Sequence, residues 1–600
     1  MRTSFLLFVC KLQFDFVWNS IYNNYDMKKL LVYLKKYKIQ AVLAPLFKML
    51  EASFELIVPL VVASIIDNGI LGGNSSRVLS GAGVLVLLAV VGMVAAISAQ
   101  YFAARAATGF ATDLRHSLFE RIQSFSYAEL DSIGVSTLIT RMTNDVNQAQ
   151  NAVNMVLRLF LRSPFIVAGA LIMALTIDLR ASLIFLGVIL LLSIVVYAVM
   201  KKTFPMYKTV QQTLDGVTLI TRENLTGARV IRAFTQEEAE QERFIRRNNL
   251  LAHFQRVVGR ISALMNPLTF VIVNVGIIVL IRYGAVTVNS GRLSQGSVVA
   301  LYNYMSQILV ELIKFANLIV TITKGFASGA RIAAVLEVEN TLQHETSDTK
   351  SDTHAVLFDD VSLTYRGAGA PSLSHISFAA EKGDVVGIIG PTGSGKSSLV
   401  NLIPHYYDAT EGRVTVDGKN VKAYPDEVLR GIIGFVQQKA VLFSGTVRDN
   451  IRWGKQDATD AEIDEALKMA QIYDTVYEKN GLDTVIEQGG ANLSGGQKQR
   501  LSVARALVAK PSIIVLDDSA SALDFATERA MREAILNLDY RPTLFIVSQR
   551  CSSILTADTI LVLDDGKCVD SGTHSELLSR CELYREIYYS QFEKEGAANE

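Results

Sequence analysis

The pattern of apolar and polar positions divides this sequence into two parts. Six apolar segments before residue 330 are each long enough to cross a bilayer. They cover residues 39–65, 78–104, 153–177, 181–203, 262–282 and 296–321. Beyond them the apolar runs are short, such as residues 385–389 and 512–517, and are typical of strands buried on both faces. The pattern predicts an all-α membrane domain with six spanning helices, followed by an α/β domain.

Composition agrees with this division. At 600 residues the chain is too long for one ordinary domain, and 50% hydrophobic against 19% charged residues is too apolar for a soluble protein of this size. The formal net charge is zero, so nothing indicates a nucleic-acid partner. The four cysteines, Cys10, Cys551, Cys568 and Cys581, avoid the predicted membrane domain. They form no disulfide framework and suit a soluble half in a reducing cytosol.

Changes in the pattern set the expected domain boundaries. Residues 1–26 hold an apolar run too short for a span and lack an A-x-A cleavage site, so we expect no signal peptide. Met27 begins a basic amphipathic stretch, and our hypothesis is that it is the native first residue. The expected parts are an extension 1–26, a membrane domain 27–338, a polar linker 339–353, a soluble domain 354–590 and a tail 591–600.

The basic residues predict the orientation of the chain. Lysines and arginines gather in residues 28–38, 115–141 and 201–260, whereas the alternate connections between spans are short. By the positive-inside rule the basic segments are cytoplasmic. We therefore expect a multi-pass protein of the plasma membrane, with both termini and the soluble domain in the cytoplasm. The two long cytoplasmic loops are expected to be helical extensions of the spans.

Several charged residues inside the predicted spans require an explanation, because each is costly in hydrocarbon. They are Lys48, Glu51, Glu55, Arg158, Arg162, Glu311 and Lys314. Lys48, Glu51 and Glu55 lie on one face of the first span, and Glu311 and Lys314 are three residues apart in the sixth. Opposite charges within each span can therefore neutralise each other inside the bundle. Alternatively, Glu51, Glu55 or Glu311 lines a water-filled substrate cavity and attracts cationic amphiphiles. For the two arginines of the third span we expect snorkelling or cytoplasmic exposure.

The most informative motif follows the apolar run 385–389. Its residues are Gly390, Pro391, Thr392, Gly393, Ser394, Gly395, Lys396 and Ser397, followed by Ser398 and a predicted helix over 398–403. A strand that leads through a glycine-rich turn into a helix points backbone N–H groups at one place and so cradles phosphates. Lys396 supplies a positive charge for the β and γ oxygens, and the Ser397 hydroxyl can bind Mg²⁺.

Two further motifs complete a family pattern. The run 512–517 ends at Asp517, which would complete the Mg²⁺ site, and residues 493–497 are Leu-Ser-Gly-Gly-Gln. In this order the motifs resemble those of ATP-binding-cassette (ABC) transporters, and spans fused ahead of the cassette resemble the exporter branch. The resemblance extends over residues 27–590 and implies a type IV exporter fold with a P-loop NTPase domain, using ATP and Mg²⁺.

The resemblance also assigns roles to further residues. Ser494, Gly495, Gly496 and Gln497 would cap a nucleotide held by the opposite subunit, and Asp524 belongs to the D-loop. Tyr365 would stack on adenine, and Gln438 would contact the metal ion and the attacking water. Transverse helices at the tips of the long loops, near 130–134 and 222–227, would touch the ATPase domains.

Two positions depart from the family pattern. In the resemblance, residues 390–397 are the Walker A motif, residues 512–517 are Walker B and residues 493–497 are the signature. The family's glutamate after the Walker B aspartate, which polarises the attacking water, is Asp518 here. The family's histidine in the switch strand is Gln549 here. The Asp518 side chain is one methylene shorter, so its carboxylate is poorly placed as a general base. Gln549 can donate a hydrogen bond to the γ-phosphate but carries no charge. Asp518, Gln549 and Gln438 are therefore the candidate catalytic residues of a weakened nucleotide site.

A weakened site beside an intact signature suits one subunit of a heterodimer. The expected partners are a second ABC half-transporter with Glu and His at those positions, the lipid bilayer, and a hydrophobic or amphipathic substrate such as a drug, lipid or peptide. Three alternatives stay open: a homodimeric exporter with a slow ATPase, a regulatory or structural ATP-binding subunit, and an importer ATPase. The fused spans disfavour the importer.

Overall fold

The computed structural model describes residues 29–345 and 353–592. They form two compact units: the first contains the described residues of Met1–Gln123 and Ser136–Val338, and the second contains Ser124–Val135 and those of Glu339–Glu600. The expected extension 1–26, with Cys10 and the start hypothesis at Met27, lies outside the described residues. Residues 346–352 of the linker and 593–600 of the tail also lie outside them. The domain boundaries stay predictions.

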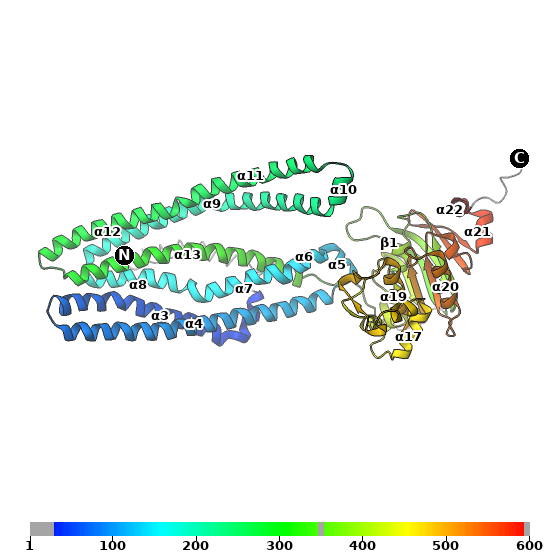
Figure 1. The fold of residues 1–600 in the computed structure, drawn as a ribbon, viewed down its shortest axis with the longest axis horizontal. Coiled ribbons are helices and arrows are strands. Elements are labelled where there is room, and N and C mark those ends of the chain that lie inside the picture. Colours follow the sequence, from blue (N-terminus) through cyan, green and yellow to red (C-terminus); the bar gives the residue numbers. More distant parts are fainter. Residues whose placement is uncertain (1–28, 346–352, 593–600) are drawn as a thin grey trace. The chain divides into compact units, whose positions relative to one another are not determined.

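Within residues 29–345, six long helical spans form the first unit, which confirms the predicted all-α fold (Figure 1). They are Leu31–Ile70, Ser75–Gln123, Val135–Ile177, Leu179–Thr226, Glu237–Asn289 and Gln295–Leu336. Each contains one of the predicted apolar segments. The lengths, from 40 to 53 residues, exceed the roughly 20 residues that a bilayer requires, because the helices continue into polar sequence.

Several spans are built from more than one helix. The helices of the first unit are α3 (Lys38–Ser64), α4 (Ser75–Gln123), α6 (Val135–Thr140), α7 (Val146–Met155), α8 (Arg162–Ile177), α9 (Leu179–Thr226), α10 (Ala228–Ala233), α11 (Glu237–Ala263), α12 (Met265–Asn289) and α13 (Gln295–Leu336). Two π-helical turns, Arg141–Asp145 and Val156–Phe160, interrupt the third span. α3 packs along α4, and α13 packs along α7 and α8.

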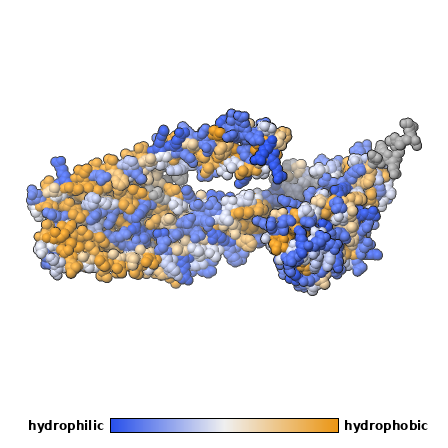
Figure 2. All heavy atoms as spheres, in the orientation of Figure 1, coloured by the Kyte–Doolittle hydropathy of each residue, from blue (hydrophilic) through white to orange (hydrophobic). Residues whose placement is uncertain are grey.

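Apolar side chains cover the outside of the spans. Figure 2 shows them gathered over α3, α4 and α12, whereas the ends of α9 and α11 beside α10 are polar. Leu79, Leu87 and Ile97 of α4 and Val271 and Ile278 of α12 are among the exposed large apolar residues. A soluble protein rarely exposes so extended an apolar surface, so this belt is the surface that faces lipid.

Two sheets form most of the second unit. The larger has six strands in the order β12-β11-β3-β10-β9-β6, all parallel except β12 at one edge. The smaller is antiparallel, in the order β2-β1-β4-β5, and β7 pairs with β8. The strands are β1 (Val356–Leu363), β2 (Leu373–Ala380), β3 (Val385–Ile389), β4 (Glu411–Val416), β5 (Lys419–Asn420), β6 (Ile433–Val436), β7 (Gly445–Thr446), β8 (Val485–Ile486), β9 (Ile513–Asp517), β10 (Thr543–Val547), β11 (Thr559–Asp564) and β12 (Lys567–Gly572).

Helices surround these sheets and enclose two apolar cores. They are α5 (Tyr127–Ile133), α14 (Lys396–Val400), α15 (Asp426–Gly431), α16 (Val447–Ile451), α17 (Asp460–Met469), α18 (Tyr473–Tyr477), α19 (Gly495–Leu507), α20 (Phe525–Leu536), α21 (His574–Arg580) and α22 (Glu582–Gln591). Phe358 and Phe545 belong to the core that both sheets share. The helix predicted over 398–403 is displaced: α14 begins at Lys396 and ends at Val400.

The strand order brings the nucleotide motifs together. β3 and β9 both pair in parallel with β10, so their carboxyl ends lie at the same edge of the sheet. β3 leads into the glycine-rich loop, and β9 ends at Asp517. Ligands of open α/β sheets bind at this kind of edge.

The two predicted loop tips differ in outcome. α5 covers the first: Ser126 caps its N-terminus in a capping box with Glu129, and Gly134, whose φ is 80°, follows its last residue. At the second, predicted near 222–227, the short helix lies six residues later in the sequence. Residues 222–226 remain in α9, because the Gly227 N–H closes the last turn on the Glu223 carbonyl oxygen at 2.7 Å, and the short helix α10 begins only at Ala228.

Candidate functional site

The glycine-rich loop requires glycine at two of its positions. Gly390 has a φ of 155° and Gly395, the residue before α14, a φ of 94°. A Cβ atom at Gly390 would lie 2.0 Å from the Leu563 carbonyl oxygen, and one at Gly395 would lie 2.7 Å from that of Ser372. The backbone can therefore take this path from β3 to α14 only without side chains at these points.

Lys396 lies inside this loop and is only 9% exposed. Its Nζ donates to the carbonyl oxygens of Gly390 at 2.9 Å and Pro391 at 2.7 Å. Burial lowers the pKa of Lys396, and the nearby carboxylates of Asp518 and Asp517 oppose this change. An ammonium group buried among neutral carbonyls is stabilised by an anion, so the position suits a phosphate oxygen.

A hydroxyl and a carboxylate from the two Walker motifs meet at the sheet edge. Ser397 Oγ donates to Asp517 Oδ1 at 3.0 Å, and Asp517 is 5% exposed. Burial raises the pKa of Asp517, as does the neighbouring Asp518, whereas Ser397 and Lys396 lower it. A buried carboxylate that is costly to ionise, beside a hydroxyl oxygen, is a donor set that fits Mg²⁺.

Asp518 lies next to this pair in an unusual backbone conformation. Its φ is 46°, and its N–H donates to the Val547 carbonyl oxygen at 3.0 Å. Gln438 Nε2 donates to Asp518 Oδ2 at 3.2 Å. Burial raises the pKa of Asp518, while Gln438, Lys396 and Arg550 lower it. The structure thus joins two of the three candidate catalytic residues.

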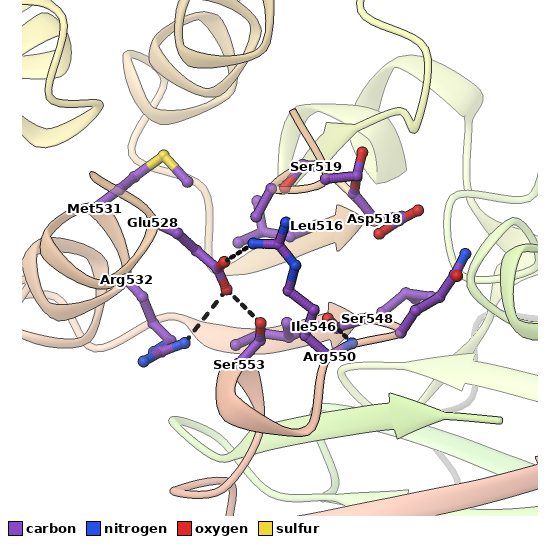
Figure 3. A pocket seen from close by; sticks show the side chains of 14 residues that line it. Leu516, Asp518, Ser519, Glu528, Met531, Arg532, Ile546, Ser548, Arg550 and Ser553 are labelled. Carbon is purple, nitrogen blue, oxygen red and sulfur yellow. Dashed lines mark hydrogen bonds and ion pairs between the residues drawn. The ribbon is translucent and has the colours of Figure 1, made fainter. Parts of the chain in front are cut away.

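Gln549 and Asp518 line the same cavity of ≈ 310 Å³ (Figure 3). The cavity lies between α20 and the segments that follow β9 and β10. Gln549 is held through its backbone, because its carbonyl oxygen accepts from Gln591 Nε2 at 2.7 Å. Asp518 therefore lies in contact with Gln438 and shares this cavity with Gln549.

Sequence reasoning missed a buried carboxylate in this cavity. Glu528 of α20 is buried and accepts from Arg550 at 3.0 Å, from the Ser553 hydroxyl, and pairs with Arg532 at 3.5 Å. Figure 3 shows this cluster beside Asp518, whose side chain points away from it. Through Arg550 and Ser553, Glu528 links α20 to the segment after β10, which also contains Gln549. A glutamate on the buried face of α20 carries no motif that could have identified it.

Tyr365 lies beside the helix that follows the phosphate loop. Its hydroxyl donates to Ser398 Oγ at 3.0 Å, and its ring meets the Tyr407 ring edge-on at 5.0 Å between centroids. Burial raises the pKa of Tyr365. The residue lies two positions beyond the end of β1. This places an aromatic ring near the phosphate loop, as base stacking requires.

The signature residues contact a different group of side chains. Ser494 caps α19, accepting from the Gln497 N–H at 3.2 Å, and its own N–H donates to Gln497 Oε1 at 3.0 Å. One turn along α19, Gln499 accepts from the Ala522 N–H at 3.1 Å. The D-loop ends at Asp524, which caps α20 by accepting from Thr527 at 2.9 Å. The Gln499 bond joins the signature helix α19 to the D-loop.

Comparisons with known proteins agree with this geometry. The family described as the ABC transporter transmembrane region matches residues 42–312, and the ABC transporter family matches residues 373–521. The ABC transporter ATP-binding protein YfiB of Bacillus subtilis (strain 168) is 40% identical over 572 residues, covering 95% of this chain and 100% of that protein. The chain belongs to the ABC transporters.

Two further relatives of this ABC transporter are informative. The ATP-dependent lipid A-core flippase of Syntrophus aciditrophicus (strain SB) is 31% identical over 494 residues, which are 81% of each protein. The structure of a bacterial Atm1-family ABC exporter with ATP bound has a TM-score of 0.78, with 24% identity, over 94% of this chain and 99% of that chain. The fold is that of an ABC exporter half-transporter, which binds ATP and couples its hydrolysis to transport.

The transporter's charged residues inside the spans form two groups. Lys48 pairs with Glu51 at 2.6 Å, and Lys314 pairs with Glu311 at 3.0 Å, as the first of the two predicted alternatives requires. The expectation for Arg162 is wrong. It is 6% exposed and donates to Glu311 at 2.6 Å and to Glu55 at 2.8 Å. The physical reason is that two carboxylates from other spans meet it in the bundle, so it need not reach water.

In this ABC transporter, α5 contacts the ATPase fold through aromatic side chains. The Tyr127 and Tyr406 rings stack at 4.3 Å between centroids, and Gln437 Nε2 donates to the Tyr127 hydroxyl at 3.2 Å. Tyr407 donates to Asp131 Oδ2 at 2.6 Å. The Gln437 amide thus links α5 to the segment that follows β6.

Proposed function

We propose that this chain is one subunit of a heterodimeric ABC exporter and that its own Walker motifs form a slow nucleotide site. The observation that carries the proposal is that Asp518 and Gln549 line one cavity, while Asp518 is also close to Lys396. The first offers a shortened carboxylate and the second an uncharged amide, where the family has glutamate and histidine.

The geometry of Asp518 supports a weak general base. Its carboxylate accepts a hydrogen bond from Gln438 Nε2 at 3.2 Å. The aspartate side chain is also one methylene shorter than the glutamate that the family has at this position. A base must come within hydrogen-bond reach of the water that it activates, and loss of a positioned base costs on the order of 10²–10⁴-fold in rate. Gln549 adds no positive charge against the γ-phosphate. ATP can then be held tightly while its hydrolysis is slow.

Nucleotide binding itself would use residues that match the family. Lys396 and the backbone of the loop hold the phosphates, and Tyr365 stacks on the base. Ser397, Asp517 and Gln438 would hold Mg²⁺, which neutralises phosphate charge when bound. Ser494 and the helix dipole of α19 would face the γ-phosphate on the partner's Walker motifs, where the faster hydrolysis occurs.

The proposed substrate is a lipid or another amphipathic molecule moved outward across the plasma membrane. Support comes from the relatives named lipid A-core flippases, at 31% and 33% identity, and from a half-exposed Glu55 in the first span. Both termini and the ATPase fold are proposed to lie in the cytoplasm.

The first test restores the two missing groups. We expect the purified full-length chain to hydrolyse ATP slowly, Asp518→Glu to raise the rate by less than about tenfold, and Asp518→Glu with Gln549→His to raise it by more than the product of the single changes. The two side chains act on one transition state, so their effects are not additive. Steady-state phosphate release in lipid nanodiscs at saturating ATP is the measurement, and Lys396→Ala in the same background is the control.

Two results would contradict the proposal. If the wild-type chain alone hydrolyses ATP as fast as the double variant, the chain is a homodimeric exporter with an ordinary site. If the tagged chain, purified from its native membrane, brings down no second half-transporter, the heterodimer is wrong. ATP-dependent uptake of a fluorescent lipid into inverted vesicles, with and without this chain, distinguishes a transporting subunit from a purely regulatory one.

A further inference from the structure

We propose that His344, His405 and Asp426 form a binding site for a transition-metal ion, with Zn²⁺ as the best fit. Within the second unit these residues offer ligand atoms that all lie within 4.8 Å of one another. The three come from separate parts of the sequence: the segment after α13, the loop between α14 and β4, and the start of α15. The proposal does not depend on the proposed heterodimer.

His405 is the centre of the argument because its imidazole is 1% exposed and only half satisfied. Its Nε2 lies 2.9 Å from Asp408 Oδ1, while Nδ1 is buried without a hydrogen-bond partner among the described residues. In the neutral imidazole with Nε2–H donating to Asp408, Nδ1 carries the unshared lone pair. A carboxylate that orients a histidine through its outer nitrogen is the usual support of a metal-binding imidazole.

Asp426 has a matching unsatisfied atom. Its Oδ2 pairs with Arg430 at 3.0 Å, whereas its Oδ1 is buried and has no partner in the described part of the chain. The Nδ1 lone pair and the carboxylate oxygen are both acceptors, so neither can satisfy the other. A cation between them satisfies both, and burial without one is costly.

His344 supplies the third ligand from an exposed position. Its ring meets that of His405 edge-on, at 5.7 Å between centroids and 87° between planes. The backbone is held on both sides, because the Gln343 N–H donates to Asp408 Oδ2 at 2.8 Å and the Glu345 N–H donates to the Lys422 carbonyl oxygen at 2.9 Å. Tetrahedral Zn²⁺ keeps its ligands about 3.3 Å apart, so a small rotation of the His344 side chain closes the site.

The donor set selects the metal. Two imidazoles and one carboxylate are ligands of Zn²⁺, with water in the fourth position, and are too poor in oxygen for Mg²⁺ or Ca²⁺. Two positively charged side chains lie nearby. Lys422 Nζ is 3.6 Å from Asp408 Oδ1, and Arg430 forms an ion pair with Asp426 Oδ2. Both leave the inner atoms Nδ1 and Oδ1 free. A bound ion would connect residues 339–345 to α15 through its ligands His344 and Asp426.

The test uses the full-length chain, purified with a tag that contains no histidine and stripped of metal with a chelator. We expect calorimetric titration with Zn²⁺ to show one tight site per chain. Co²⁺ should give the intense visible absorption of a four-coordinate ion. His344→Ala and Asp426→Asn should each weaken Zn²⁺ binding by at least about 10–100-fold, the loss known for weaker supporting residues. His375→Ala, which removes an exposed histidine paired with Asp360, should change nothing.

Melting temperatures with and without Zn²⁺ distinguish a variant that has lost a metal ligand from one that no longer folds. Zn²⁺ should raise the melting temperature of the wild type and of His375→Ala but not of His344→Ala, which alters only an exposed side chain. Asp408→Asn should weaken Zn²⁺ binding while ATP binding is kept. The proposal is overturned if the wild type binds no Zn²⁺ at micromolar concentration, or if His344→Ala binds it as tightly as His375→Ala does.

Discussion

At the scale of single residues, Asp517 holds a carboxylate where the fold alone disfavours a negative charge. Its folded pKa is raised by burial, so its contribution to stability is present at low pH and is lost as pH rises through the folded pKa. At neutral pH the ionised group therefore destabilises the metal-free ATPase fold. This cost is what makes the position receptive to Mg²⁺.

Asp517→Asn should accordingly stabilise the metal-free protein while weakening nucleotide binding. Asparagine can still accept from Ser397, so we expect the melting temperature without Mg²⁺ to rise by about 2–4 °C, the shift that about 1 kcal/mol produces in a unit of this size. The extra stabilisation by Mg²⁺ with ATP should disappear. Scanning calorimetry with and without both ligands is the measurement. Asp524→Ala, which removes the cap of α20, is the control with the opposite sign, and equal shifts for both would refute this account.

At the scale of elements, the third span is joined to the first and sixth by one buried cation. Arg162 begins α8, immediately after a π-helical turn, and its two carboxylate partners lie on α3 and α13. Ser163 also donates to Glu311 at 2.8 Å. A single side chain thus links three helices that come from separate spans.

Arg162→Met should therefore destabilise the membrane unit strongly, by about 3–5 kcal/mol, because it removes the buried cation that pairs with the buried carboxylate of Glu311. Arg158→Met, four residues earlier, changes the same residue type and serves as the matched control with little expected effect. Adding Glu311→Gln to Arg162→Met should recover part of the loss. Thermal unfolding in detergent, followed by the loss of the helical circular-dichroism signal, measures all three. Equal losses for both arginine variants would show that the ion pairs do not hold the helices.

At the scale of the whole molecule, the six spans and the distribution of basic residues predict a single orientation. In a chain whose cysteines are replaced by serine, Asn74→Cys in the exposed turn before α4 should react with a membrane-impermeant maleimide added to intact cells. Asn248→Cys, equally exposed on α11, should react only after the membrane is opened. The reverse pattern would invert the proposed topology and remove the ATPase fold from the cytoplasm.

Many elements of this fold and its phosphate loop can be predicted from local sequence. The spans are determined by long runs of apolar residues, and the phosphate loop by glycines between a strand and a helix, because each depends on residues close together in the chain. The departures at Asp518 and Gln549 are likewise visible without a structure, since each lies at a fixed distance from a motif.

Other features depend on which segments the fold places side by side. The meeting of Ser397 with Asp517 follows from the order of β3, β10 and β9, and the partners of Arg162 come from spans that are remote in sequence. Glu528 and the group formed by His344, His405 and Asp426 lie in no motif. Sequence determined the elements and the nucleotide chemistry, whereas only tertiary structure decided which buried polar groups face each other, because that depends on long-range packing rather than on local spacing.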